Sequence, residues 1–75
     1  MSSQTLPTLR MGSNGNDVKY LQEILNKIHY GPLGADGTFG AKTEAAVKRF
    51  QKAFNLTVDG IVGQKTWNAL QSQIH

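Results

Sequence analysis

The chain has 75 residues, 39% of them hydrophobic and 17% charged, which is typical of one small globular domain rather than a disordered segment. It contains no cysteine, which excludes disulfides and cysteine-based zinc sites, and no apolar run approaches the roughly 20 residues that span a bilayer. The net charge of +3 favours anionic partners in general, without selecting nucleic acid, an acidic polymer or a membrane surface.

The first eight residues are expected to form a flexible arm. They are polar, include one proline and lack the hydrophobic stretch of a signal peptide. Leu6 and Leu9 are the residues able to pack this part of the chain onto the body. We therefore divide the chain into an N-terminal arm, residues 1–8, and a single domain, residues 9–75.

A first helix is predicted over about residues 16–28, after the turn-forming residues 12–15. We expect Asn14, or else Asn16, to cap its N-terminus. Apolar residues recur every three or four positions, which indicates a helix with one buried face. These residues are Val18, Leu21, Ile24, Leu25 and Ile28.

The pattern Asp-Gly-x-x-Gly-x-Lys-Thr starts at Asp36 and recurs 23 residues later at Asp59. Each copy leads into an apolar-periodic stretch, which predicts a second helix over about residues 40–53 and a third over about residues 63–72. The predicted fold is all-α: a compact three-helix bundle with two similar Asp-Gly turn-plus-helix units. The residues expected to face inward are Thr43, Ala46, Val47, Phe50 and Phe54 on the second helix, Thr66, Trp67, Leu70 and Ile74 on the third, and Leu33, Phe39, Leu56, Val58 and Val62 in the connections.

The residue types of the repeated unit suit a turn that enters a helix. Aspartate accepts backbone N–H bonds, and the glycine after it adopts a positive φ without steric cost. A hydrophobic residue followed by glutamine closes each stretch, at Phe50-Gln51 and Leu70-Gln71, and again at Leu21-Gln22 in a divergent first copy. We interpret the aspartate, glycine, apolar and threonine residues of the repeated unit mainly as fold-forming, with ligand contact as the second interpretation.

Catalytic chemistry is not predicted. His29 and His75 are the only histidines, and neither has a metal-ligand spacing with a carboxylate. No serine lies in a nucleophile-elbow sequence. Asp36 and Asp59 occupy equivalent turn positions and are better explained as turn formers than as an acid–base pair. We expect no enzyme activity, no metal and no cofactor.

Basic and aromatic side chains suggest where a ligand could bind. Lys42, Arg49 and Lys52 lie in one stripe along the second helix, at positions i, i+7 and i+10. The alternative interpretation is a plain solvated face. Tyr30 lies in a Gly-Pro loop and can present its ring to a sugar, whereas core packing is the better interpretation for Trp67 and Phe39.

One known family shares the order and spacing of three sets of residues: Leu9-Arg10-Met11-Gly12-Ser13-Asn14-Gly15 with Val18, Leu21-Gln22 and Leu25; residues 28–43 with Ala46-Val47-Lys48-Arg49-Phe50-Gln51; and residues 56–63 with Thr66-Trp67-Asn68-Ala69-Leu70. Through them, most of the chain, residues 9–70, resembles the bacterial peptidoglycan-binding domain family. The family is typically non-catalytic, folds into three helices and holds cell-wall hydrolases on murein, so the resemblance implies action at the bacterial cell envelope or outside the cell. Asn16 and Ala41 stand where many members have proline.

We place the candidate site between the first Asp-Gly loop, residues 33–39, and the flank of the second helix. A basic stripe suits the carboxylates of peptidoglycan stem peptides, and the glycan strand is the alternative ligand fragment. The expected partners are peptidoglycan and a hydrolase domain in the full-length protein; we expect no nucleic acid, no membrane and a monomer. The candidate ligand-binding residues are Tyr30, Leu33, Asp36, Gly37, Thr38, Lys42 and Arg49.

Two other functions remain as alternatives. The first is a protein-interaction module or pro-domain without murein affinity, since a related helical fold forms the pro-segment of matrix metalloproteinases. That pro-segment uses a cysteine to block zinc, and this chain has none. The second is nucleic-acid binding, which only the small net charge and the short basic stripe support.

Overall fold

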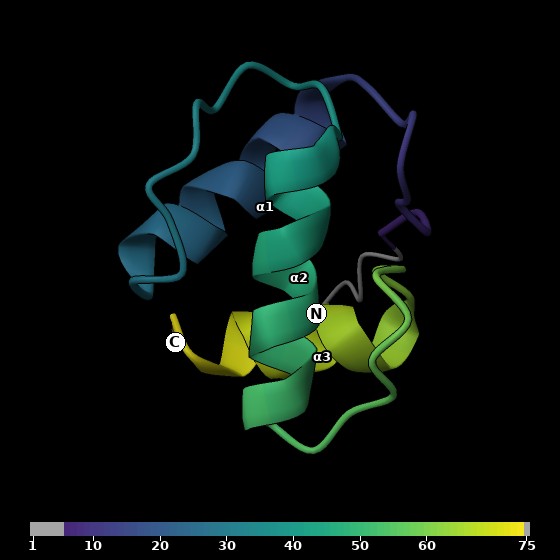
Figure 1. Cartoon of the computed structure of the whole chain (residues 1–75), viewed down its shortest axis with the longest axis vertical. Coiled ribbons are helices and arrows are strands. Elements are labelled where there is room, and N and C mark those ends of the chain that lie inside the picture. The colour runs from purple at the N-terminus through teal and green to yellow at the C-terminus, as the bar shows by residue number, and fades with distance from the viewer. Residues whose placement is uncertain (1–5, 75) are drawn as a thin grey trace, which may run out of the picture.

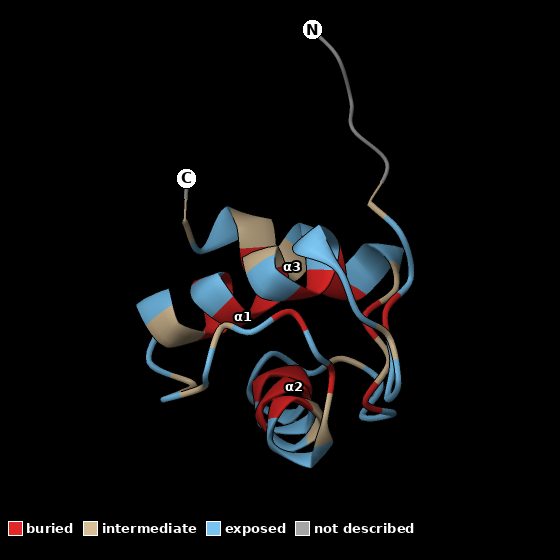
Figure 2. Cartoon of the chain, turned by 90° about the horizontal axis from the view of Figure 1, so that it is seen from above, coloured by how far each residue is buried: buried red, intermediate tan, exposed pale blue. Residues whose placement is uncertain are grey.

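The computed structural model describes residues 6–74, and within that range it contains three α-helices and no strand. The helices are α1 (Asn16–Lys27), α2 (Ala41–Ala53) and α3 (Gln64–Ser72). In Figures 1 and 2, α1 and α3 lie side by side, and α2 crosses the pair at a steep angle on one side. The predicted all-α three-helix fold is confirmed, and the observed helix bounds differ from the predicted ones by only a residue.

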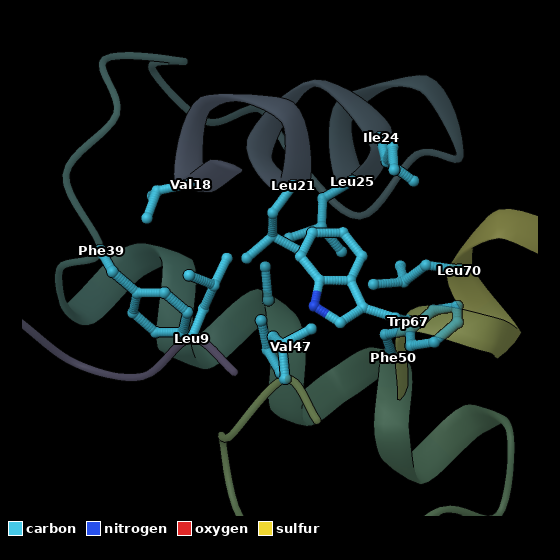
Figure 3. Packing of buried hydrophobic residues seen from close by; sticks show 12 residues of the cluster. Leu9, Val18, Leu21, Ile24, Leu25, Phe39, Val47, Phe50, Trp67 and Leu70 are labelled. Atoms are coloured by element: carbon cyan, nitrogen blue, oxygen red, sulfur yellow. The ribbon is translucent and has the colours of Figure 1, made fainter. Parts of the chain in front are cut away.

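The hydrophobic core fills the space enclosed by the three helices. Trp67 lies at its centre and is fully buried. Phe39 and Phe50 are buried too, and they lie on either side of Trp67 in Figure 3. The Trp67 ring stacks on Tyr20 at a centroid distance of 5.9 Å, and its Nε1–H donates to the Pro7 carbonyl at 2.8 Å. The core residues are Leu9, Val18, Leu21, Ile24, Leu25, Phe39, Ala46, Val47, Phe50, Val62, Trp67 and Leu70.

Two predicted core positions are wrong. Phe54 is 36% exposed and Val58 is 48% exposed. Phe54 is the C-cap of α2, so the helical stripe ends before it, and its ring instead stacks on Phe50 from outside. Val58 lies in the loop between α2 and the second Asp-Gly turn. Leu33, Leu56 and Ile74 are half-buried against the core, so these three positions fit the prediction only in part.

The segment before α1 holds both Asp-Gly units to the body. Leu9 pairs with Val62 through two backbone hydrogen bonds of 3.1 and 2.8 Å, and Asn14 forms a second bridge with Thr38. Leu6 packs against the core, and the carbonyl of Pro7 accepts the Trp67 bond. The end of the predicted arm thus contacts the domain, while residues 1–5 lie outside the described range.

The N-terminus of α1 is not capped by asparagine, so that prediction is wrong. The N-cap is Gly15, at φ 124°, and no side chain bonds to it. Its N–H donates to the Gly37 carbonyl at 2.9 Å, and its carbonyl accepts the Lys19 N–H at 3.2 Å. Asn14 is part of the bridge to Thr38, which places it in the extended segment before the helix.

The loops leave α1 and α2 in the same way. His29 and Asn55 follow the C-caps with φ of 72° and 58°, the left-handed conformation of a Schellman motif. The Tyr30 N–H donates to the Leu25 carbonyl at 2.7 Å, and the Leu56 N–H donates to the Gln51 carbonyl at 2.8 Å. Each loop therefore starts in the same direction relative to its helix.

Candidate ligand-binding site

A buried glutamine lies beneath the first Asp-Gly turn and holds it in place. Gln22, on α1, is 1% exposed. Its Oε1 accepts the Gly37 N–H at 2.9 Å, and its Nε2 donates to the Thr38 carbonyl at 2.9 Å. The same nitrogen reaches Thr43 Oγ1 at 3.0 Å and Asp36 Oδ1 at 3.3 Å. One side chain thus connects α1, the turn and the start of α2.

Gln51 repeats this arrangement beneath the second turn. It is 1% exposed, and its Oε1 accepts the N–H groups of Gly60 and Asp59 at 3.0 and 3.1 Å. Its Nε2 donates to the Ile61 carbonyl at 2.9 Å, to Asp59 Oδ1 at 3.0 Å and to Thr66 Oγ1 at 3.3 Å. The structural counterpart of Gln51 is Gln22. Gln71 is half-buried, and the sequence has no Asp-Gly turn after it.

Asp36 and Asp59 each accept a backbone hydrogen bond within their own turn. Asp36 Oδ1 accepts the Thr38 N–H at 3.0 Å, and Asp59 Oδ1 accepts the Ile61 N–H at 2.9 Å. The Thr38 N–H, with help from Gln22, holds the pKa of Asp36 below its usual 3.8. The Ile61 N–H lowers the pKa of Asp59 in the same way, against a smaller opposing effect of desolvation. Both carboxylates therefore remain ionised where they are needed as acceptors.

Two adjoining hollows lie over the first unit, and they contain most of the predicted site. One, of about 270 Å³, is bounded by the turn and the start of α2. The other, of about 390 Å³, lies between the preceding loop and the flank of α2. Leu33 and Lys42 line both, which makes them one continuous surface. Of the predicted residues, Tyr30, Leu33, Asp36, Thr38, Lys42 and Arg49 line these hollows.

The predicted residues differ in how much of their surface a ligand can reach. Gly37 is buried at φ 81° and bonded to Gln22, so it supports the surface from below. The Tyr30 ring packs edge-on against Phe50 at 5.6 Å. The exposed Arg49 guanidinium donates to the Tyr30 carbonyl at 2.7 Å, which ties the loop to α2. Lys52, the third residue of the basic stripe, is exposed and does not line either hollow.

A third hollow, which sequence reasoning missed, lies over the second unit. It has a volume of about 480 Å³. The repeat was the signal that could have found it, because a repeated turn implies a repeated surface. Its lining residues are Asn55, Leu56, Thr57, Asp59, Ile61, Gly63, Gln64, Lys65 and Thr66.

Within residues 6–74, no group of three or more histidine, aspartate and glutamate side chains is placed to hold a metal ion. In the same range, no helix has the length and apolar character to cross a membrane. His29 is exposed in the turn that follows α1, and His75 lies outside the described residues. The adjoining hollows of the first unit are lined by two basic side chains, Lys42 and Arg49.

Comparison with known proteins gives a consistent result. A family model described as "Putative peptidoglycan binding domain" matches residues 14–70. The chain is 45% identical to a zinc D-Ala-D-Ala carboxypeptidase of Streptomyces albus G, over 84% of the chain and 26% of that protein. It is 40% identical to a type VI secretion system spike protein of Vibrio cholerae, over 87% of the chain and 8% of that protein. Among solved structures, the SleB N-terminal domain matches with a TM-score of 0.91 and 33% identity, covering 97% of this chain and all of that one.

Proposed function

Because the chain belongs to the family of putative peptidoglycan-binding domains, we propose that it binds peptidoglycan through the adjoining hollows of the first Asp-Gly unit. The domain is a non-catalytic binding module of the bacterial cell wall. The observation that carries the proposed location is the continuity of the two hollows, which share Leu33 and Lys42.

The chemistry of this surface suits a stem peptide attached to a glycan. Leu33 and Tyr30 offer half-buried apolar surface, which a bound fragment would cover. Lys42 and Arg49 are exposed cations at the rim, and carboxylates are their natural partners. The Arg49 guanidinium is already held by the Tyr30 carbonyl, so little side-chain freedom is lost when a ligand carboxylate binds to it.

The chain spans 8% and 26% of the length of the two curated relatives described above. In those proteins, the matching segment accompanies a much longer remainder, and one of them is named as a zinc D-Ala-D-Ala carboxypeptidase. We infer that this domain likewise keeps an attached hydrolase or other protein on murein. It would then work at the cell envelope or outside the cell, as a monomer, without nucleic-acid or membrane partners.

Sedimentation with purified murein sacculi tests this proposal. We expect the folded chain to be retained at moderate salt and Arg49→Ala to be retained less. The variant loses one exposed hydrogen bond, worth about 1 kcal/mol, so the fold survives. Lys19→Ala, on the exposed side of α1, is the matched control and should bind normally. The difference should shrink as salt rises, because exposed ion pairs are screened.

Retention no greater than that of a denatured control would contradict peptidoglycan binding by this domain. Co-purification with a specific protein, together with absent murein binding, would then favour a protein-interaction module. Normal retention of Arg49→Ala at low salt would leave peptidoglycan binding intact but would move the site away from the first unit.

A further inference from the structure

We propose that the hollow over the second Asp-Gly unit is a second binding site for the same repeating fragment of peptidoglycan. The inference rests on the proposed function and extends it from one site to two. A polymer of identical disaccharide-peptide units presents many copies of one fragment, so a domain that repeats its own binding surface can hold two of them.

The two hollows over the Asp-Gly turns are lined by equivalent residues. Every position that lines the hollow at the start of α2, apart from the glutamine beneath it, has its counterpart 23 residues later in the hollow at the start of α3. The equivalent pairs are Leu33 and Leu56, Gly34 and Thr57, Asp36 and Asp59, Thr38 and Ile61, Gly40 and Gly63, Ala41 and Gln64, Lys42 and Lys65, and Thr43 and Thr66.

The same scaffold fixes both surfaces. A buried glutamine bonds to the aspartate, the turn backbone and the threonine of its own unit. Each turn glycine has a positive φ, 81° at Gly37 and 73° at Gly60. The lysine and the half-buried leucine of each unit therefore have equivalent places relative to the turn. A fragment bound in the hollow at the start of α2 would meet the same leucine, aspartate, lysine and threonine in the hollow at the start of α3.

The differences between the hollows do not exclude a shared ligand. The hollow at the start of α3 is larger than the one at the start of α2, about 480 against 270 Å³, and it has Ile61 where the other has Thr38. Ile61 and Leu56 are half-buried, so they add apolar surface that a sugar face or a peptide methyl can cover. The basic side chain, Lys65 in place of Lys42, is kept.

The two hollows over the Asp-Gly turns are separate surfaces. The first lies at the start of α2, and the second lies along the loop that leaves the end of α2 and turns back to begin α3 (Figure 1). The linings of the two hollows have no residue in common. Occupancy of one hollow therefore leaves the other open.

A titration with a soluble muropeptide of one disaccharide-peptide repeat tests the inference, with backbone and side-chain shifts followed by NMR. We expect two molecules of the fragment to bind per chain. The shifts should form two clusters, one at Leu33, Thr38 and Lys42 and the other at Leu56, Ile61 and Lys65.

Two matched variants separate the sites without disturbing the fold. Gly40 and Gly63 line the two hollows, and a Cβ added at either meets nothing within 4 Å. Both have extended backbones, at φ −108° and −93°, and both are helix N-caps, where aspartate is favoured. Gly40→Asp and Gly63→Asp thus place a carboxylate in one hollow each, while the thermal midpoint should stay the same or rise.

Gly63→Asp should remove the second cluster of shifts and reduce the stoichiometry to one, and Gly40→Asp should do the same for the first cluster. Lys65→Ala should weaken the second cluster alone. A single cluster in the unsubstituted chain, in either hollow, would overturn the inference. The result would remain distinct from failure of the proposed function, because sacculus retention would persist with one occupied hollow and disappear if the domain does not bind murein.

Discussion

The turns at Gly37 and Gly60 have nearly the same backbone conformation and the same hydrogen bonds to a buried glutamine, but they pack against different neighbours. A Cβ added at Gly37 would lie 3.1 Å from the backbone carbonyl oxygen of Gly15. A Cβ added at Gly60 would instead lie 3.0 Å from Glu44 Cγ and 3.1 Å from Lys48 Cε.

The motif therefore sets the backbone geometry of each turn, whereas the neighbouring atoms determine how well the turn glycine tolerates an added side chain. The Gly15 carbonyl is held by the Lys19 N–H at the start of α1, and the Gly15 N–H is bonded to Gly37. The backbone next to the first turn therefore has little room to shift. The side chains beside the second turn are flexible and half-buried or exposed, so they can rotate away.

The largest expected loss of stability comes from truncating the buried hydrophobic residue of each unit, and it should differ between the two units. Phe39 and Val62 hold equivalent positions and are 1% and 0% exposed. Phe39→Ala should destabilise by roughly 3–5 kcal/mol, because it removes a buried ring and leaves a cavity. Val62→Ala should cost about 2 kcal/mol, since it removes only two methyl groups. Urea unfolding measures both, and an unchanged midpoint for Phe39→Ala would contradict its burial.

The glutamines beneath the turns should show nearly equal losses. Gln22→Met and Gln51→Met keep the side-chain length but leave buried groups without partners, including the N–H of Gly37 or Gly60. We expect each to cost roughly 2–4 kcal/mol, from one or two unsatisfied groups. Gln71→Met, on a half-buried residue of α3, is the control and should stay within about 0.5 kcal/mol. A marked inequality between the first two would show that the networks are not equivalent.

Alanine at the turn glycines should reveal the difference between the neighbours. Gly60→Ala should cost about 1 kcal/mol, the strain of a left-handed alanine. Gly37→Ala should cost about 2 kcal/mol or more, because the rigid Gly15 carbonyl adds crowding to the same strain. Gly34→Ala, where a Cβ has open space, is the control. Equal losses at Gly37 and Gly60 would mean that the surroundings do not matter.

The smallest effect concerns acid stability, where the two turns should behave alike. The pKa values of Asp36 and Asp59 are lowered in the folded state relative to 3.8. A lowered pKa stabilises the fold above the unfolded value, and this contribution is lost as the pH falls through the folded value. Asp36→Asn and Asp59→Asn keep an Oδ1 acceptor without the charge, so each should flatten the fall of the unfolding midpoint between about pH 5 and pH 2. An unchanged pH profile in both variants would contradict the lowered pKa values.

The helices and most of the core could be predicted from the sequence because apolar spacing and the Asp-Gly turns are local signals. The buried glutamines could not, since periodicity treats Gln22 and Gln51 as surface residues. Their burial depends on turns that lie 15 and 9 residues further along the chain. The Gly15 cap was missed for a similar reason, because its N–H is satisfied by the carbonyl of Gly37.

The candidate site was predictable to the extent that it is local to one loop and one helix. Tyr30, Leu33, Lys42 and Arg49 lie close in sequence to the loop or on one helix face, and the structure brings them around the adjoining hollows. The bond from Arg49 to the Tyr30 carbonyl was not predictable, since it depends on how the loop folds back over α2. For the hollow over the second Asp-Gly unit, the repeat indicates an equivalent surface, and the structure adds that this surface is concave.

The central claim is that murein binds at the hollows of the Asp-Gly units. The most direct test is to measure how well a double charge-reversal variant binds to sacculi. Lys42→Glu with Lys65→Glu changes one lysine in each hollow, and both side chains are exposed, so the fold should persist. Lys19→Glu with Lys27→Glu on α1 gives the same net charge away from the hollows. We predict that the first double variant loses retention on sacculi while the second retains most of it. Equal retention of the two variants would contradict the account.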